Sequence, residues 1–248
     1  MRPLDDRSVS DVLAFVVVFS IIITSVGLVY GVGFSSLSDF QQGEQKTNAV
    51  RAFDALSTGF DNVQHDRSPA SSGAIQLNGG TIQVEEQTEF EVSVEDSSGS
   101  TVWGPQTNTT GSLRYTIDGT YVAYESGAVF RKDRGSSAMV SEPSFVCSDD
   151  RAVVSLVAFD GLSGARGGDT NVEVITRRES NQLLYSYPDG SGGSGPDSVV
   201  LSIDDSEYGD AWERYLVENG WQDLGGGEYS CSADVVVVRV TVVTVEFQ

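Results

Sequence analysis

The chain has 248 residues, with 36 Asp and Glu against 15 Lys and Arg, and its formal net charge is −21. This acidic balance excludes a general phosphate-binding surface, because nucleic-acid binding needs clustered Lys and Arg, and we expect no nucleic-acid partner. Lys46 and Lys132 are the only lysines, and scarce lysine with a dense carboxylate surface is typical of salt-adapted proteins, which predicts a halophilic source.

An uncharged, mostly apolar run from Val12 to Phe34 follows the N-terminus. About 20 apolar residues suffice to cross a bilayer as a helix, so we predict a transmembrane helix over residues 9–36. Arg2 and Arg7 precede the run, and no other basic residue lies near it. The positive-inside rule then predicts a short cytoplasmic leader-like segment, residues 1–8, with the rest of the chain outside the cell membrane.

A secretory signal peptide is the alternative interpretation of this run. Its apolar core usually has about 7 to 15 residues and ends at a small-residue cleavage site. The run here is longer, and the bulky Tyr30 and Phe34 follow Gly27, where such a site would lie. We therefore expect the helix to be retained.

The segment Asp6-Arg7-Ser8-Val9-Ser10-Asp11-Val12-Leu13 resembles the start of haloarchaeal type IV pilin-like proteins. The resemblance implies that a prepilin-type peptidase cuts between Ser8 and Val9 and that the freed helix packs into a filament core. Ser8 stands where the family usually has Gly, and Asp11 stands where it usually has Pro. If the leader is retained, the chain is instead a permanently anchored, unprocessed envelope protein with a binding ectodomain.

Gly27 and Gly31 have the small-xxx-small spacing that lets helices approach closely within a membrane. The spacing predicts helix packing, and so self-association or binding to other pilin-like subunits, through this face. The alternative is that both glycines reflect only the general frequency of Gly in membrane helices.

Apolar residues then recur every three or four positions, which predicts an amphipathic stalk helix over residues 37–66. Pro69 should end it, since proline disfavours helix in the residue before it. A long N-terminal helix followed by a β domain is the layout of type IV pilins, which supports the same resemblance. A membrane anchor whose helix lies on its own ectodomain would give the same periodicity.

From Ala74 onward the pattern has period two and predicts a mainly antiparallel, sandwich-like β ectodomain over 74–248. With the N-terminal helix this is an α+β chain, and whether the β region is one domain or two stays open. Asp118-Gly119 and Asn78-Gly79-Gly80 predict hairpins. Further strands are predicted at Glu89–Val94, Ala128–Arg131, Ala138–Val140, Val153–Phe159, Val172–Thr176, Leu183–Tyr187, Val199–Ile203 and Asp234–Phe247. The first half of the Asp234–Phe247 strand is apolar on both faces, which indicates a central strand.

One short helix interrupts the strands. Its apolar face is formed by Tyr208, Ala211, Trp212, Tyr215 and Leu216, which we interpret as core rather than as a ligand platform. The acidic cluster Asp204, Asp205, Glu207 and Asp210 does not have the spacing of an EF-hand, and capping of this helix explains it more simply.

Cys147 and Cys231 are the two cysteines, and each lies a few residues before an apolar strand. Each cysteine precedes its strand by the same number of residues. This spacing brings the two cysteines to one end of the fold if the strands run parallel, or opposite each other across a sandwich. Outside the membrane a disulfide between them is the natural expectation.

No catalytic residue, cofactor site or metal site is predicted. His65 is the only histidine, and we expect it to be a solvated residue at the end of the stalk helix. Asn108-Thr109-Thr110 is an N-glycosylation sequon and would suit an extracellular surface. The leading hypothesis is a structural, pilin-like function, and a permanently anchored envelope protein is the alternative. An ectoenzyme based on dispersed carboxylates is the third hypothesis.

Overall fold

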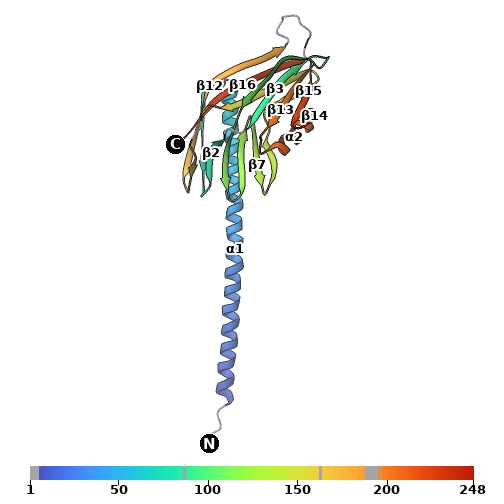
Figure 1. Cartoon of the computed structure of the whole chain (residues 1–248). Coiled ribbons are helices and arrows are strands. Elements are labelled where there is room, and N and C mark those ends of the chain that lie inside the picture. The colour runs from blue at the N-terminus through green and yellow to red at the C-terminus, as the bar shows by residue number, and fades with distance from the viewer. Residues whose placement is uncertain (1–5, 86–87, 162–163, 188–194, 196) are drawn as a thin grey trace. The chain divides into compact units, whose positions relative to one another are not determined.

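The computed structural model describes residues 6–85, 88–161, 164–187, 195 and 197–248, and their side chains except those of 6–10, 32–35 and 38–39. Within these residues it has two helices and sixteen strands, an α+β fold (Figure 1). The elements are α1 (Asp6–Gln64), β1 (Ala70–Gln76), β2 (Thr81–Glu85), β3 (Glu89–Glu95), β4 (Thr101–Thr109), β5 (Ser112–Ile117), β6 (Thr120–Glu125), β7 (Ala128–Asp133), β8 (Ser136–Ser141), β9 (Val146–Ser148), β10 (Arg151–Phe159), β11 (Arg166–Gly167), β12 (Asn171–Tyr187), β13 (Ser198–Asp204), α2 (Gly209–Glu218), β14 (Gln222–Gly225), β15 (Glu228–Ser232) and β16 (Val235–Phe247).

The strands form three sheets. Sheet A has the order β1-β12-β16-β10-β9, sheet B the order β11-β2-β5-β6-β7-β8, and sheet C the order β14-β15-β13-β3-β4. All pairs are antiparallel except β10 with β16, which run parallel. The chain divides into two compact units, residues 1–47 and 48–248, so that α1 contributes to both.

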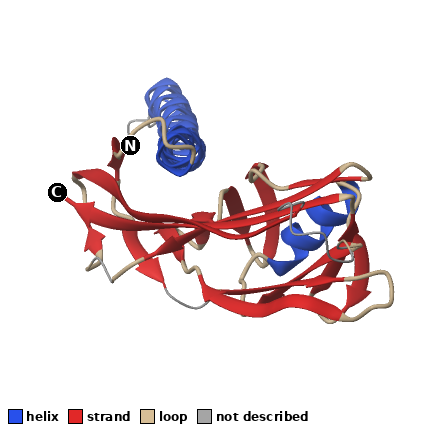
Figure 2. Ribbon diagram, turned by 90° about the horizontal axis from the view of Figure 1, so that it is seen from above, coloured by secondary structure: helices blue, strands red, loops and turns tan. Residues whose placement is uncertain are grey.

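Residues 48–248, the β domain, have two apolar cores. In the first, buried residues of sheets A, B and C surround α2, which Figure 2 shows between strands at one end of the domain. In the second, the last turns of α1 pack on sheets A and B through Phe53, Phe60 and Val63. Strand β16 contributes side chains to both cores. Val236 and Val238 point into the first core, and residues of the opposite parity farther along the strand point into the second.

Several sequence predictions are confirmed. β5 and β6 form the hairpin expected around Asp118-Gly119, with Ile117 paired to Thr120. β16 lies in the centre of sheet A, as its apolar character indicates. α1 ends at Gln64, close to the boundary that Pro69 predicts. The sequence leaves open whether the β region is one domain or two; early and late strands share all three sheets, and residues 48–248 form one compact unit.

The predicted hairpin at Asn78-Gly79-Gly80 is wrong. The turn exists, with positive φ at Asn78 and Gly79, but it carries the chain from β1 in sheet A to β2 in sheet B. A Cβ on Gly80 would lie 2.5 Å from the Tyr115 ring, so the turn needs glycine there for a tight approach. The β region also starts at Ala70 rather than Ala74.

The two strands predicted at Val172–Thr176 and Leu183–Tyr187 are one strand, β12, which pairs with β16 along its length. The residues between the two predicted strands are polar. They are polar because they bind the end of α1: Arg178 donates to the carbonyl of Val63, and Asn181 to that of Gln64. Two β-bulges let the long strand bend there. Residues 188–196 are rich in Gly and Ser, a composition that predicts a flexible loop, and except for Gly195 they lie outside the described residues.

Candidate functional sites

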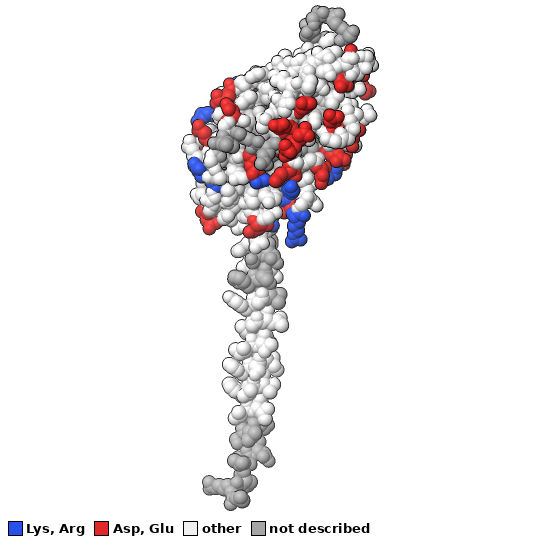
Figure 3. All heavy atoms as spheres, viewed as in Figure 1, with Lys and Arg blue, Asp and Glu red and all other residues white. Residues whose placement is uncertain are grey.

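The most distinctive surface of the molecule is the N-terminal part of α1. Asp11–Gly31 is a 21-residue segment of mean hydropathy 2.8, none of it buried, so it is long and apolar enough to cross a bilayer. Its large apolar side chains are 50–72% exposed from Val12 to Tyr30. Figure 3 shows this stretch without charged side chains on the face in view, whereas acidic residues gather on the β domain.

The polar residues of this segment are suited to an apolar environment. Ser20, Thr24 and Ser25 each donate a hydrogen bond of 2.7 Å to the carbonyl four residues earlier. Their hydroxyl protons are therefore satisfied within the helix and need no water, which lowers the cost of placing them in lipid.

Ser20, Thr24, Gly27 and Gly31 lie on one face of the helix, because their spacing of four, three and four residues matches its period. Within the part of the chain that the structure describes, no other side chain or distant backbone approaches within 4 Å of a Cβ built on Gly27 or Gly31. The glycines predicted to pack against another helix thus lie on an open, small-residue face; their partner stays a prediction.

Ser8 and Val9 belong to the first turns of α1, which begins at Asp6. Their side chains lie outside the described residues, and cleavage between them stays a prediction.

Among the described residues of the β domain one carboxylate is buried, that of Glu125 at the end of β6, with 1% of its surface exposed. It accepts hydrogen bonds from the hydroxyls of Thr88 (2.6 Å) and Ser206 (2.7 Å) and from the indole N–H of Trp212 (2.7 Å). These three donors come from the residue before β3, the loop before α2, and α2 itself. The carboxylate therefore ties sheets B and C and α2 together, a contact that sequence periodicity does not show.

Burial raises the pKa of the Glu125 carboxyl, an effect that its hydrogen-bond donors partly offset and the neighbouring Glu207 increases. The hydroxyl of buried Tyr208 has no hydrogen-bond partner within the described part of the chain, and burial raises its pKa as well. At the mouth of this region Arg114 forms ion pairs with Glu85 and Glu207, the latter at 3.0 Å. These neighbours give Glu125 a structural role, since all its donors are neutral and none is placed as a nucleophile.

We expect the wild type to lose stability relative to the Glu125→Gln variant as pH rises. A carboxyl whose pKa is raised on folding stabilises the fold fully below its unfolded pKa and loses that contribution as pH rises through the folded value. Glutamine keeps the carbonyl acceptor for Ser206 and Trp212 and does not titrate. Urea midpoints from pH 4 to pH 8 measure this, with exposed Glu89→Gln as the matched control. Parallel profiles for Glu125→Gln and the wild type would contradict it.

The capping role predicted for the acidic cluster before α2 is wrong. The N-cap residue is Tyr208, and no side chain caps the helix there. The Ser206 hydroxyl donates a hydrogen bond to Glu125, and the Ser206 hydroxyl oxygen accepts one from the Tyr208 N–H. No three His, Cys, Asp or Glu side chains gather into a metal-binding group in the described part of the chain. The aromatic face of α2 is buried, as expected for core.

His65 is not the solvated residue that its position suggested. It is half-buried; its Nδ1 lies 2.9 Å from the Asp61 carbonyl, and its Nε2 lies 3.1 Å from the Arg239 guanidinium of β16. The neighbouring Gln64 is buried and donates to the Ser155 carbonyl at 3.0 Å. The end of α1 is therefore fixed to sheet A by polar contacts with residues that lie far away in the sequence.

Cys147 and Cys231 form the expected disulfide, with 5.8 Å between their Cα atoms. The bond links β9 of sheet A to β15 of sheet C. Both anticipated arrangements contribute, since the following strands β10 and β16 are parallel and the bond itself crosses between sheets.

Asn108 lies in β4, an edge strand of sheet C, and is half-buried. The hydroxyl-bearing residue of its sequon, Thr110, has no exposed surface and donates to the Thr88 carbonyl at 3.4 Å. The folded domain thus hides part of the sequon, and glycosylation of Asn108 stays a prediction that would require modification before folding.

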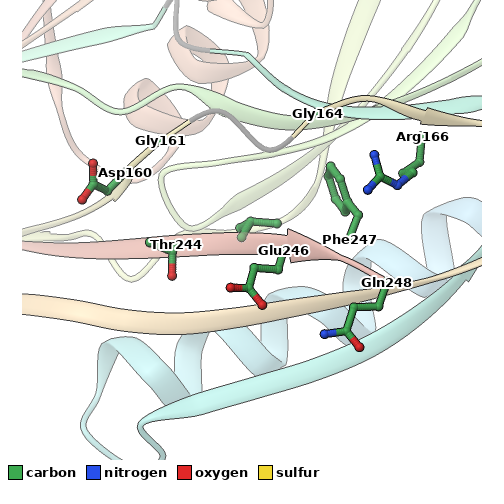
Figure 4. Close-up of a pocket in the computed structure, with 9 residues that line it drawn as sticks. Asp160, Gly161, Gly164, Arg166, Thr244, Glu246, Phe247 and Gln248 are labelled. Atoms are coloured by element: carbon green, nitrogen blue, oxygen red, sulfur yellow. The ribbon is translucent and has the colours of Figure 1, made fainter.

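A cleft of 540 Å³ lies beside the end of β16 (Figure 4). Among the described residues that line it, Thr244 carries the hydroxyl, and it donates a hydrogen bond of 3.3 Å to the carboxylate of Glu179 on the neighbouring strand β12. Asp160 and Arg166 lie at opposite sides of the close-up.

Comparisons with known proteins agree in giving no activity. The family DUF7289, described as a family of unknown function, matches residues 7–248. An uncharacterized protein of Archaeoglobus fulgidus is 24% identical over 181 residues, which cover 66% of this chain and 69% of that protein. No solved structure matches the chain.

Proposed function

Since the chain belongs to DUF7289, whose function is unknown, we propose from its own residues that it is a structural, membrane-anchored cell-surface protein, a pilin-like subunit or minor component of a type IV pilus-like assembly. The observation that carries the proposal is the exposed apolar segment Asp11–Gly31 in a helix whose last turns belong to the core of a β domain. In this function the segment holds the chain in the membrane, with the N-terminus cytoplasmic and the β domain outside.

The small-residue face supports a structural function. Ser20, Thr24, Gly27 and Gly31 let a second apolar helix approach closely, which drives association in lipid by packing rather than by the hydrophobic effect. Outside the helix, the buried Glu125 and the disulfide act on the stability of the β domain. An archaeal source fits the relative from Archaeoglobus fulgidus.

The deciding experiment is the mass of the mature N-terminus in protein from native membranes and from sheared surface filaments. A chain that starts at Val9 and is recovered in filaments would bear out processing and assembly. An intact N-terminus found only in membranes would refute the pilin-like function and leave a permanently anchored envelope protein.

Gly27→Leu is expected to weaken association of the full chain in lipid vesicles about tenfold, because a large side chain separates the helix backbones. Energy transfer between donor- and acceptor-labelled copies, measured against the protein-to-lipid ratio, reports the association. Val29→Leu is the matched control, since residue 29 lies on the opposite side of the helix from the small-residue face. Equal effects of the two substitutions would mean that this face is not the contact.

A further inference from the structure

A stretch of α1 from Gln41 to Asn48 differs from the helix on both sides of it. These residues make about two helical turns and carry no apolar side chain. Before the stretch Leu37 and Phe40 are apolar and exposed, and after it Ala49, 5% exposed, is the first described residue of α1 that is buried. The stretch, which we name the polar segment, therefore lies between the apolar part of the helix and the turns that pack into the β domain.

Side-chain contacts give the polar segment little support. Helices in proteins are held mainly by the packing of an apolar face, and residues 41–44 are exposed while 45–47 are only half-buried. Glu44 and Lys46 are two positions apart and do not face each other, and no residue of opposite charge lies three or four positions from either. Neither packing nor ion pairs along the helix therefore stabilise these turns.

Gly43 weakens the helix within the polar segment. In a helix interior glycine is the least favourable residue apart from proline. Among the described residues no side chain or distant backbone lies within 4 Å of a Cβ built on Gly43, so packing within the chain does not require glycine there. The glycine therefore lowers the stability of the helix at this point, and an alanine would fit the same backbone.

A hydrogen bond made by Thr47 weakens the same turn. Its hydroxyl donates at 2.9 Å to the Gly43 carbonyl, which is also the acceptor of the Thr47 backbone N–H in a regular helix. A hydroxyl that competes for such a carbonyl slightly destabilises a helix and often bends it. Ser20, Thr24 and Ser25 make the same kind of bond in the apolar segment, but there no glycine accepts it.

We propose that the polar segment is a hinge, at which α1 opens and bends while the helix on each side of it stays intact. The last turns of α1 are held by the second apolar core, and Asp11–Gly31 is long and apolar enough to be held by a bilayer. Bending at Gly43–Thr47 breaks neither set of contacts. It costs only backbone hydrogen bonds of exposed turns, which water replaces, and such turns open at the low-stability end of a structure. The inference concerns the helix alone and does not rest on leader cleavage or on assembly.

The test is the distance between two spin labels on α1, measured in the full chain in detergent micelles. Leu37→Cys and Ala55→Cys place the labels at exposed positions on either side of the polar segment. The native cysteines are bonded to each other, so only the engineered thiols react. A straight helix, at 1.5 Å per residue, separates the two backbone sites by about 27 Å.

The wild type is expected to show a broad distribution of distances with a bent population below the straight-helix value. Gly43→Ala should reduce that population about fivefold, the ratio that corresponds to the helix propensities of alanine and glycine. Thr58→Ala is the matched control, because Thr58 is exposed and also donates to the carbonyl four residues earlier, but lies among the packed turns. It should leave the distribution unchanged.

A single narrow distribution at the straight-helix distance in the wild type would overturn the hinge. So would a bent population that Gly43→Ala and Thr58→Ala change equally. Neither result depends on where the protein is found in the cell or on filaments, which separates this test from that of the proposed function.

Discussion

Phe60→Ala is expected to lower the free energy of unfolding of the β domain by about 3–5 kcal/mol, the usual cost of removing a buried phenyl ring. Phe60 is 1% exposed, stacks on Tyr124 with 4.1 Å between ring centroids, and meets Phe159 edge-on at 5.9 Å. Its ring therefore joins α1 to sheets A and B at once. Denaturant unfolding of the full chain in detergent, followed by tryptophan fluorescence, measures the change.

Phe40→Ala is the matched control for this prediction. Phe40 belongs to the same helix but is 65% exposed, so its truncation should change the unfolding free energy by less than about 0.5 kcal/mol. Similar losses for both variants would show that the last turns of α1 do not belong to the cooperative core of the β domain.

The double variant Cys147→Ser/Cys231→Ser is expected to have a free energy of unfolding about 4 kcal/mol lower than that of the wild type, as the chain-entropy model gives for loss of the disulfide. The cysteines are 84 residues apart in sequence, so the bond restricts a long loop of the unfolded chain. It also ties sheet A to sheet C. Denaturant midpoints of the two proteins, at matched detergent and salt, give the difference.

A reductant supplies the control for the disulfide. Wild-type protein unfolded with reductant should match the double variant, and the double variant itself should not respond to reductant. A wild type that is as stable reduced as oxidised would contradict the prediction, because the covalent restriction would then contribute nothing.

The sequence predicts elements better than it predicts their partners. Period-two alternation locates most strands, and Asp118-Gly119 fixes one hairpin because the turn chemistry is local. Asn78-Gly79-Gly80 has equally good turn chemistry, but the pairing of β1 with β12 and of β2 with β5 depends on residues far along the chain. Local signals cannot choose between those pairings.

The sites divide in the same way. The exposed helix and its Gly27–Gly31 spacing are local patterns and are visible in sequence. Glu125 acquires its buried environment from Thr88 and Trp212, and His65 acquires Arg239 from the other end of the chain. The one available signal for Glu125 is its position at the inner end of an apolar strand, Thr120–Glu125, where a charge must find partners.

The order of strands in sheet A has a consequence for biosynthesis. Sheet A joins β1, the first strand to leave the ribosome, through β12 to β16, the last. The last turns of α1 pack against Val243, Val245 and Phe247 of that final strand. The helix is thus made before β16, and Phe60 and Val63 lack part of their native cover until that strand has been synthesised. Native docking of α1 is therefore a late step in the folding of the β domain.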